Sequence, residues 1–200
     1  MIRHGKTLAN EQKLYCGQTD LQLSDNGIRE LLDLKKQGIY PGCMGEKFVK
    51  RTTSLKSGLY FTSGLLRTEQ TLDLLYGSVQ REALPQLAEY SFGKFEMKSH
   101  AELNEQPDYQ AWITDETGLF TCPGGESRND FLHRVTIGLE VLCTKIKDVE
   151  SALVICHGGV IASIMEQLFP DKHNFYEWQP KPGRGYTLIN LSDKPQYKKI

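Results

Sequence analysis

Two segments of this chain end in the same short pattern, a histidine followed at once by glycine. His4, near the start of the chain, is followed by Gly5, and His157 closes the apolar run 152–156 and is followed by Gly158. Open α/β sheets build sites where a strand ends in a reactive side chain and turns into a helix, because strand carboxyl ends and helix amino ends meet there. The pattern therefore predicts a parallel sheet in which both imidazoles lie at one edge.

Hydrophobic periodicity extends this prediction along the chain. Ser24 is an N-cap candidate for a helix over 21–38, and Pro85 weakens a candidate strand over 81–87. Strands are expected at 58–63, 81–87, 152–156 and 186–191, and helices at 21–38, 65–76, 108–113, 127–147 and 161–169. Strands that alternate with helices predict an α/β fold of three layers (α/β/α), with a mostly parallel sheet in the middle.

The 200 residues contain no interdomain linker or internal repeat, so we expect one domain over 1–200. Residues 40–57 have no clean period and are expected to form a loop with some helix. The polar and aromatic segment 89–121 is expected to be an insertion that covers the site.

The balance of charge excludes some classes of partner. With 24 Lys and Arg against 25 Asp and Glu, the chain has a formal net charge of −1 and no overall basic field for nucleic acid or an anionic membrane. No apolar run approaches the roughly 20 residues of a membrane span, and the first residues do not resemble a signal peptide. The five cysteines form no C-x-x-C pair, which argues against a zinc module or a disulfide framework. We therefore expect a cytoplasmic protein, monomer or homodimer.

The residues near the predicted strand ends suit a phosphate group. Ser63, Arg67 and Glu89 come between the two histidines, also near strand ends. Arg3 and Arg67 can each give forked hydrogen bonds to phosphate oxygens, which lysine cannot reproduce. Protonated His157 can add a third cationic donor. Such a set predicts a site for phosphoryl transfer.

His4 is the candidate nucleophile of this site. A neutral imidazole nitrogen attacks phosphorus readily when a hydrogen bond on the other nitrogen fixes the tautomer, and a main-chain carbonyl of the His-Gly turn can accept that bond. Glu89 suits the general acid, because its apolar neighbours Tyr90 and Phe92 favour the protonated carboxyl. This chemistry requires no metal and no other cofactor.

Several segments resemble the histidine phosphatase superfamily, which includes the cofactor-dependent phosphoglycerate mutases. The resemblance covers nearly the whole chain, with the family's blocks in order at 3–7, 63–71, 87–96, 123–127 and 156–159. It implies a phosphoglycerate mutase-like fold and a phosphohistidine on His4, with Glu89 as the acid and a phosphate pocket built from Arg3, Arg67 and His157. The residues that it implies to face the substrate are Asn10, Gln18, Ser63 and Gly158.

The chain departs from the family pattern at two places. Only Met1 and Ile2 precede Arg3, so the first strand is expected to be short and the fold less stable. Met97 follows Glu96 where the family usually has glycine, which is expected to alter the loop near the substrate.

Hydrolysis is favoured over phosphoglycerate mutase activity, because the family's mutases carry a long basic and aromatic insertion after the acid block and this chain runs directly into 99–112. The resemblance thus implies a phosphomonoester hydrolase whose substrate is a small phosphorylated metabolite, such as α-ribazole phosphate or a sugar phosphate. Candidate contacts to the leaving group are Lys98, Tyr109, Trp112 and Arg184.

Two further alternatives stay open. A binding module that has lost catalysis would need the arginines but neither His4 nor Glu89. A metal site on His4, His157 and a carboxylate would have to tolerate the charges of Arg3 and Arg67, which oppose a dication.

Overall fold

A computed structural model of the chain describes residues 1–42, 59–191 and 193–200, so most of the predicted loop 40–57 lies outside the described residues. Four parallel strands form one sheet in the order β1-β4-β2-β3, and two antiparallel strands form a separate hairpin. The parallel strands are β1 (Ile2–Arg3), β2 (Leu59–Thr62), β3 (Glu82–Ala83) and β4 (Ala152–Cys156), and the hairpin strands are β5 (Tyr186–Ile189) and β6 (Gln196–Lys199).

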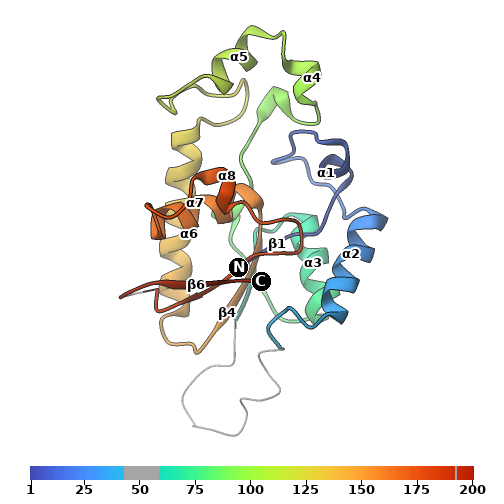
Figure 1. Cartoon of the computed structure of the whole chain (residues 1–200), viewed down its shortest axis with the longest axis vertical. Coiled ribbons are helices and arrows are strands. Elements are labelled where there is room, and N and C mark those ends of the chain that lie inside the picture. The colour runs from blue at the N-terminus through green and yellow to red at the C-terminus, as the bar shows by residue number, and fades with distance from the viewer. Residues whose placement is uncertain (43–58, 192) are drawn as a thin grey trace, which may run out of the picture.

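Helices cover both faces of the parallel sheet (Figure 1), with α2 and α3 on one side and α6 and α7 on the other. The α-helices are α1 (Leu8–Gln12), α2 (Asp25–Lys36), α3 (Leu66–Tyr76), α4 (His100–Leu103), α5 (Pro107–Ile113), α6 (Arg128–Ile146), α7 (Gly158–Leu168) and α8 (Phe175–Trp178). Among the described residues, no helix has both the length and the apolar character needed to cross a bilayer.

The central strand β4 shows why two layers of helices are needed. Leu153 and Ile155 belong to the apolar cluster under α2 and α3, whereas Val154 and Cys156 belong to the cluster under α6 and α7. Successive side chains of a strand point to opposite faces, so a strand that is apolar at every position must be covered on both faces. The predicted three-layer α/β/α fold is confirmed.

Some predicted elements differ from the structure. The strand expected at 81–87 has only the residues of β3, and a 3₁₀ turn over Pro85–Leu87 follows it. Proline has no N–H to continue the strand ladder, and its fixed φ suits the first position of a helical turn. The sequence pattern does not predict the helices α1, α4 and α8 or the strand β6, because each is too short or too polar to show a period.

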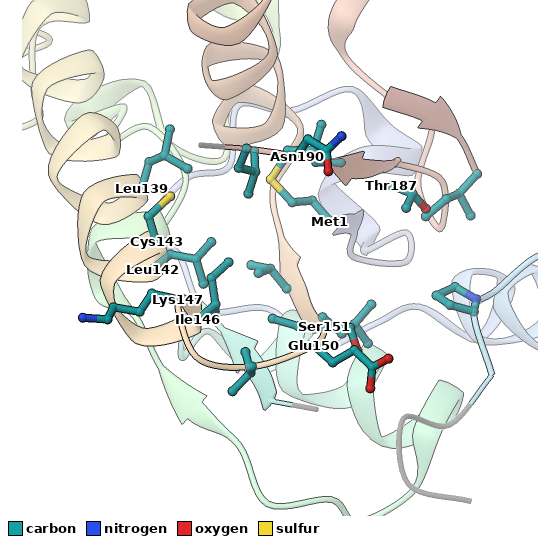
Figure 2. A pocket seen from close by; sticks show the side chains of 18 residues that line it. Met1, Leu139, Leu142, Cys143, Ile146, Lys147, Glu150, Ser151, Thr187 and Asn190 are labelled. Carbon is teal, nitrogen blue, oxygen red and sulfur yellow. The ribbon is translucent and has the colours of Figure 1, made fainter. Parts of the chain in front are cut away.

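A cavity of about 540 Å³ lies beside the amino end of β4 (Figure 2). Side chains of α6, including Leu142, Cys143 and Ile146, line it together with Thr187 of β5. The reactive residues described below follow strand carboxyl ends, at the opposite edge of the sheet. We therefore assign this cavity no part in the chemistry.

Candidate active site

Three neighbouring strands present reactive side chains at the same edge of the sheet. His4 follows β1, His157 follows β4 and Ser63 follows β2, and the strand order places β4 between the other two. The ring centroids of His4 and His157 are 5.1 Å apart, and His157 Nε2 lies 2.8 Å from Ser63 Oγ. Parallel pairing thus gathers three residues that are far apart in the sequence.

The His4 ring is held in one tautomer. Its Nδ1 lies 2.6 Å from the carbonyl oxygen of Gly5, so Nδ1 carries the proton and Nε2 keeps a free lone pair. Burial, followed by the nearby charges of Arg67 and Arg3, lowers the pKa of His4 well below its usual value. The imidazole is therefore neutral at neutral pH and is able to act as a nucleophile.

A chain of hydrogen bonds orients His157. The Thr68 hydroxyl donates to the carbonyl oxygen of Leu65 at 2.7 Å, so the Ser63 hydroxyl, 3.2 Å from it, donates to Thr68. Ser63 Oγ is then left to accept a hydrogen bond from the N–H group at His157 Nε2. The other ring nitrogen, Nδ1, is buried without a hydrogen-bond partner among the described residues.

The surroundings of His157 set its protonation state. Burial, then the charges of Arg67, His4 and Arg3, lowers its pKa well below the usual value. In the protein without a ligand the ring is therefore neutral at neutral pH, because burial first and then the neighbouring charges disfavour the cationic form.

The two arginines are fixed by main-chain carbonyls. Arg67 is 1% exposed, and its two terminal nitrogens donate to the carbonyls of Thr19 at 3.0 Å and Gly17 at 2.6 Å. Arg3 donates to the carbonyl of Pro180 at 2.8 Å, and its buried Nε has no partner among the described residues. Burial lowers the pKa of Arg3, the charge of Glu89 opposes that shift and Arg67 adds to it, so the three charges act on one another.

Glu89 is held at the amino end of α7. Its carboxylate accepts hydrogen bonds from the backbone N–H groups of Gly159 at 3.0 Å and Tyr90 at 3.1 Å. A Cβ atom added at Gly159 would lie 2.5 Å from Glu89 Oε1, so the close approach requires glycine. Arg134 supports the same segment, since it donates to the carbonyls of Ala88 and Glu89 and forms a 2.7 Å ion pair with Glu126.

The residues that the resemblance implied to face the substrate have varied surroundings. Asn10 Oδ1 accepts from the backbone N–H of Thr7 as part of the α1 capping box, and the side chain of exposed Gln18 donates to the carbonyl of Glu89. Gly158 packs against Arg3, whose Cζ would lie 3.0 Å from an added Cβ. Ser63 contacts His157, as described above.

Of the four candidate leaving-group contacts, Tyr109 is fully buried, and its hydroxyl lies 2.6 Å from that of Tyr15. Trp112 is half-buried and donates to the hydroxyl of Tyr90 at 3.1 Å. Both residues pack around Tyr15, which links the segment 89–121 to the loop after α1.

The supporting residues Thr68, Glu96 and Arg134 were not identified from the sequence. Glu96 and Glu126 lie within the family blocks 87–96 and 123–127, so those blocks were the available signal for the carboxylates. Thr68 and Arg134 lie on helices, where periodicity does not separate a functional polar residue from a solvated one. Within residues 1–42, 59–191 and 193–200, no group of three or more His, Cys, Asp or Glu residues is placed to hold a metal ion.

Comparison with known proteins identifies the family. Residues 1–195 match the histidine phosphatase superfamily (branch 1), and the chain belongs to it. Among curated relatives, the adenosylcobalamin/alpha-ribazole phosphatase of Escherichia coli is 28% identical over 172 residues, 84% of this chain and 77% of that protein. The 2,3-bisphosphoglycerate-dependent phosphoglycerate mutase of Xanthobacter autotrophicus is 25% identical over 182 residues, 86% of this chain and 82% of that protein.

Solved structures show the same fold. The alpha-ribazole phosphatase of Shigella flexneri aligns with a TM-score of 0.77 at 22% identity, covering 98% of this chain and 92% of that one. The phosphoglycerate mutase of Thermus thermophilus aligns with a TM-score of 0.68 at 27% identity, covering 98% of this chain and 94% of that one. The predicted superfamily and its fold are confirmed, and relatives include both phosphatases and mutases.

Proposed function

We propose that this protein hydrolyses small phosphate monoesters through a phosphohistidine on His4, with Glu89 as the general acid. The observation that carries the proposal is the state of His4, a buried neutral imidazole whose Nδ1 donates to the Gly5 carbonyl, so that the lone pair of the ring lies on Nε2. The nearby charges of Arg67 and Arg3 help burial to lower the pKa of His4. Arg3 Nε is a buried donor with no partner among the described residues. Such donors suit the spread negative charge of a phosphoryl group.

In the first step, His4 Nε2 attacks phosphorus and the bond between phosphorus and the ester oxygen breaks. For this step Glu89 must carry a proton, which its carboxyl gives to the departing oxygen as the alcohol leaves. In the second step, water attacks the phosphohistidine while the Glu89 carboxylate takes its proton. The bond between phosphorus and nitrogen then breaks, which releases phosphate and the free imidazole.

His157 completes the charge stabilisation in this scheme. A bound phosphate dianion raises the pKa of a neighbouring histidine, because it favours the cationic form. His157 Nδ1, the nitrogen not held by Ser63, would then donate to a phosphate oxygen. Arg3 and Arg67 hold the remaining oxygens, and Gly158 allows Arg3 to approach.

The leaving group is proposed to be a small metabolite, and α-ribazole phosphate and sugar phosphates are the first candidates. The name of the Escherichia coli relative supports the former. We further propose that segment 89–121 is an insertion that covers the site. Glu89 begins it, and Gln18 and Tyr15 tie it to the loop after α1.

The test is turnover of p-nitrophenyl phosphate and a panel of phosphate esters, with and without chelator. We expect chelator-insensitive hydrolysis that is lost in His4→Ala. A chelator-sensitive rate would instead support a metal site, and a folded protein that turns over no ester but binds phosphate would support the binding module. Transfer between 2- and 3-phosphoglycerate that outruns hydrolysis would support a mutase.

A further inference from the structure

One carboxylate binds three consecutive backbone amides beside the site. Glu96 accepts hydrogen bonds from the N–H groups of Gly17, Gln18 and Thr19 at 2.9 to 3.1 Å and from the Thr19 hydroxyl at 2.6 Å. It also accepts from Phe92 N–H at 3.2 Å, within its own segment. Bonds of this kind to a charged acceptor are stronger than those between neutral groups.

The carbonyls of the same three-residue loop face a cation. Arg67 donates to the carbonyl oxygens of Gly17 and Thr19, at 2.6 and 3.0 Å. The loop therefore lies between the Glu96 carboxylate, which binds its N–H groups, and the Arg67 guanidinium, which binds its carbonyls. One peptide group bonds both charges, because its Gly17 carbonyl accepts from Arg67 and its Gln18 N–H donates to Glu96. Each charge polarises this peptide group in the direction that strengthens the other charge's bond.

The loop also contacts the segment that bears Glu89. Gln18 donates its side-chain amide to the Glu89 carbonyl at 2.7 Å. A Cβ atom added at Gly17 would lie 1.6 Å from the Tyr90 carbonyl oxygen, so the loop packs closely against the segment that bears the acid. Fixing this loop thus constrains both Arg67 and Glu89.

We propose that Glu96 is a positioning residue, which fixes loop 17–19 so that the loop's carbonyls orient Arg67 toward a phosphate group. Two of the five guanidinium N–H groups donate to the loop, and in this proposal the remaining donors bind the ligand. Loop 17–19 thus connects the Glu96 carboxylate, which lies beside the site, to the Arg67 guanidinium in the site. The phosphate role of Arg67 rests on the proposed function, whereas the effect of Glu96 on the loop does not.

The experiment compares Glu96→Gln with Glu102→Gln, a matched control. Glu102 accepts hydrogen bonds from the backbone and hydroxyl of Ser99 in the same segment, but it makes no contact with loop 17–19. Two properties are measured in the full chain: amide hydrogen exchange at 17–19, and affinity for inorganic phosphate by calorimetry. Both variants are repeated in an Arg67→Lys background.

Glu96→Gln is expected to speed exchange at 17–19 and to weaken phosphate binding about tenfold, whereas Glu102→Gln changes neither. In the Arg67→Lys background the added effect of Glu96→Gln on phosphate affinity should largely disappear, because interacting residues are not additive. Unchanged exchange at 17–19, or an equal loss of phosphate affinity in both backgrounds, would overturn the inference. If the wild-type chain binds no phosphate and cleaves no ester, the proposed function fails, while the exchange measurement still decides whether Glu96 holds the loop.

Discussion

At the scale of single residues, close packing around Arg3 and Glu89 depends on two adjacent glycines. An added Cβ at Gly158 would lie 3.0 Å from Arg3 Cζ, and one at Gly159 would lie 2.5 Å from Glu89 Oε1. In each case the atom that must move is the end of a flexible side chain. The two substitutions should therefore disturb function more than folding, and they should disturb different steps.

Gly159→Ala is expected to displace the Glu89 carboxyl and to slow turnover of alkyl phosphates, which need a proton on the leaving oxygen, more than that of p-nitrophenyl phosphate. Inhibition by inorganic phosphate should change little. Gly158→Ala is expected to weaken inhibition by inorganic phosphate, because it displaces Arg3. It should slow turnover of both esters to a similar degree. Steady-state kinetics on both esters checks this pair, and the same pattern in both variants would contradict it.

The acid itself gives a related prediction. Glu89→Gln keeps the size of the side chain but cannot donate a carboxyl proton, so it should slow phosphorylation of His4 most for poor leaving groups. Pre-steady-state kinetics with alkyl and nitrophenyl esters measures that step. Equal slowing for both ester types would count against Glu89 as the proton donor.

Met97 adopts a left-handed backbone conformation that glycine usually occupies. Its φ of 58° lies in the left-handed region, and its N–H donates to the Tyr15 carbonyl at 2.7 Å. The departure from the family pattern noted in the sequence thus leaves a glycine-like backbone with a larger side chain. Met97→Gly is expected to stabilise the protein by up to about 1 kcal/mol, seen as a higher midpoint of thermal unfolding. A lower midpoint would show that the Met97 side chain matters more than the backbone.

At the scale of elements, predictions succeeded where a segment has a sustained helical period or a continuous apolar run. The helix expected at 127–147 is α6, Arg128–Ile146, with Phe131, Val135 and Leu142 buried on one face. The apolar run 152–156 is β4. Periodicity reports burial, so it failed for α1, a five-residue helix, and for β6, whose residues are mostly exposed.

For the candidate site too, the sequence pattern locates some residues and not others. His4 and His157 could be located because each follows a strand and precedes glycine. The bonds from Glu96 to loop 17–19 could not, since they join loops that lie about 80 positions apart and carry no period. Only tertiary structure shows which main-chain groups a loop carboxylate meets.

Capping of α6 gives a prediction at this scale. Ser127 is buried, and its hydroxyl and the carboxylate of Asp130 form a capping box. Ser127→Ala is expected to lower the free energy of unfolding by about 1 kcal/mol. Ser99→Ala, which removes the capping box of the short helix α4, is the control and should cost less, because α4 contributes little to the core. Denaturant unfolding compares the two, and a larger loss for Ser99→Ala would contradict the account.

At the scale of the whole molecule, two buried neutral histidines make stability depend on pH. Burial first, and then nearby positive charges, lowers the pKa of both His4 and His157 well below 6.5. As pH falls below about 6.5, the unfolded chain takes up protons that the folded protein does not, so the unfolded state is favoured. The contribution of the two histidines to the free energy of unfolding is therefore complete above that pH and is lost as the pH falls below it.

The slope of this loss is expected to reach about 1.4 kcal/mol per pH unit for each histidine. Glu96 adds to the loss at lower pH. Burial raises its pKa, but the hydrogen bonds from loop 17–19 outweigh burial and hold the value below 4.5, so its contribution falls as it is protonated. Denaturant unfolding between pH 7 and pH 5 should show a smaller slope in His4→Gln than in the wild type. His133→Gln, which removes an exposed imidazole on α6, is the control, and an unchanged slope in His4→Gln would contradict the prediction.

The central claim is that His4 Nε2 accepts the phosphoryl group. The most direct measurement is rapid acid-free quenching of the wild-type protein during turnover of a phosphate ester, followed by peptide mass spectrometry. We predict one phosphoryl group on the peptide that contains His4, formed at least as fast as turnover and absent in His4→Ala. Full turnover with no modification of that peptide, or with the phosphoryl group on another residue, would contradict the account.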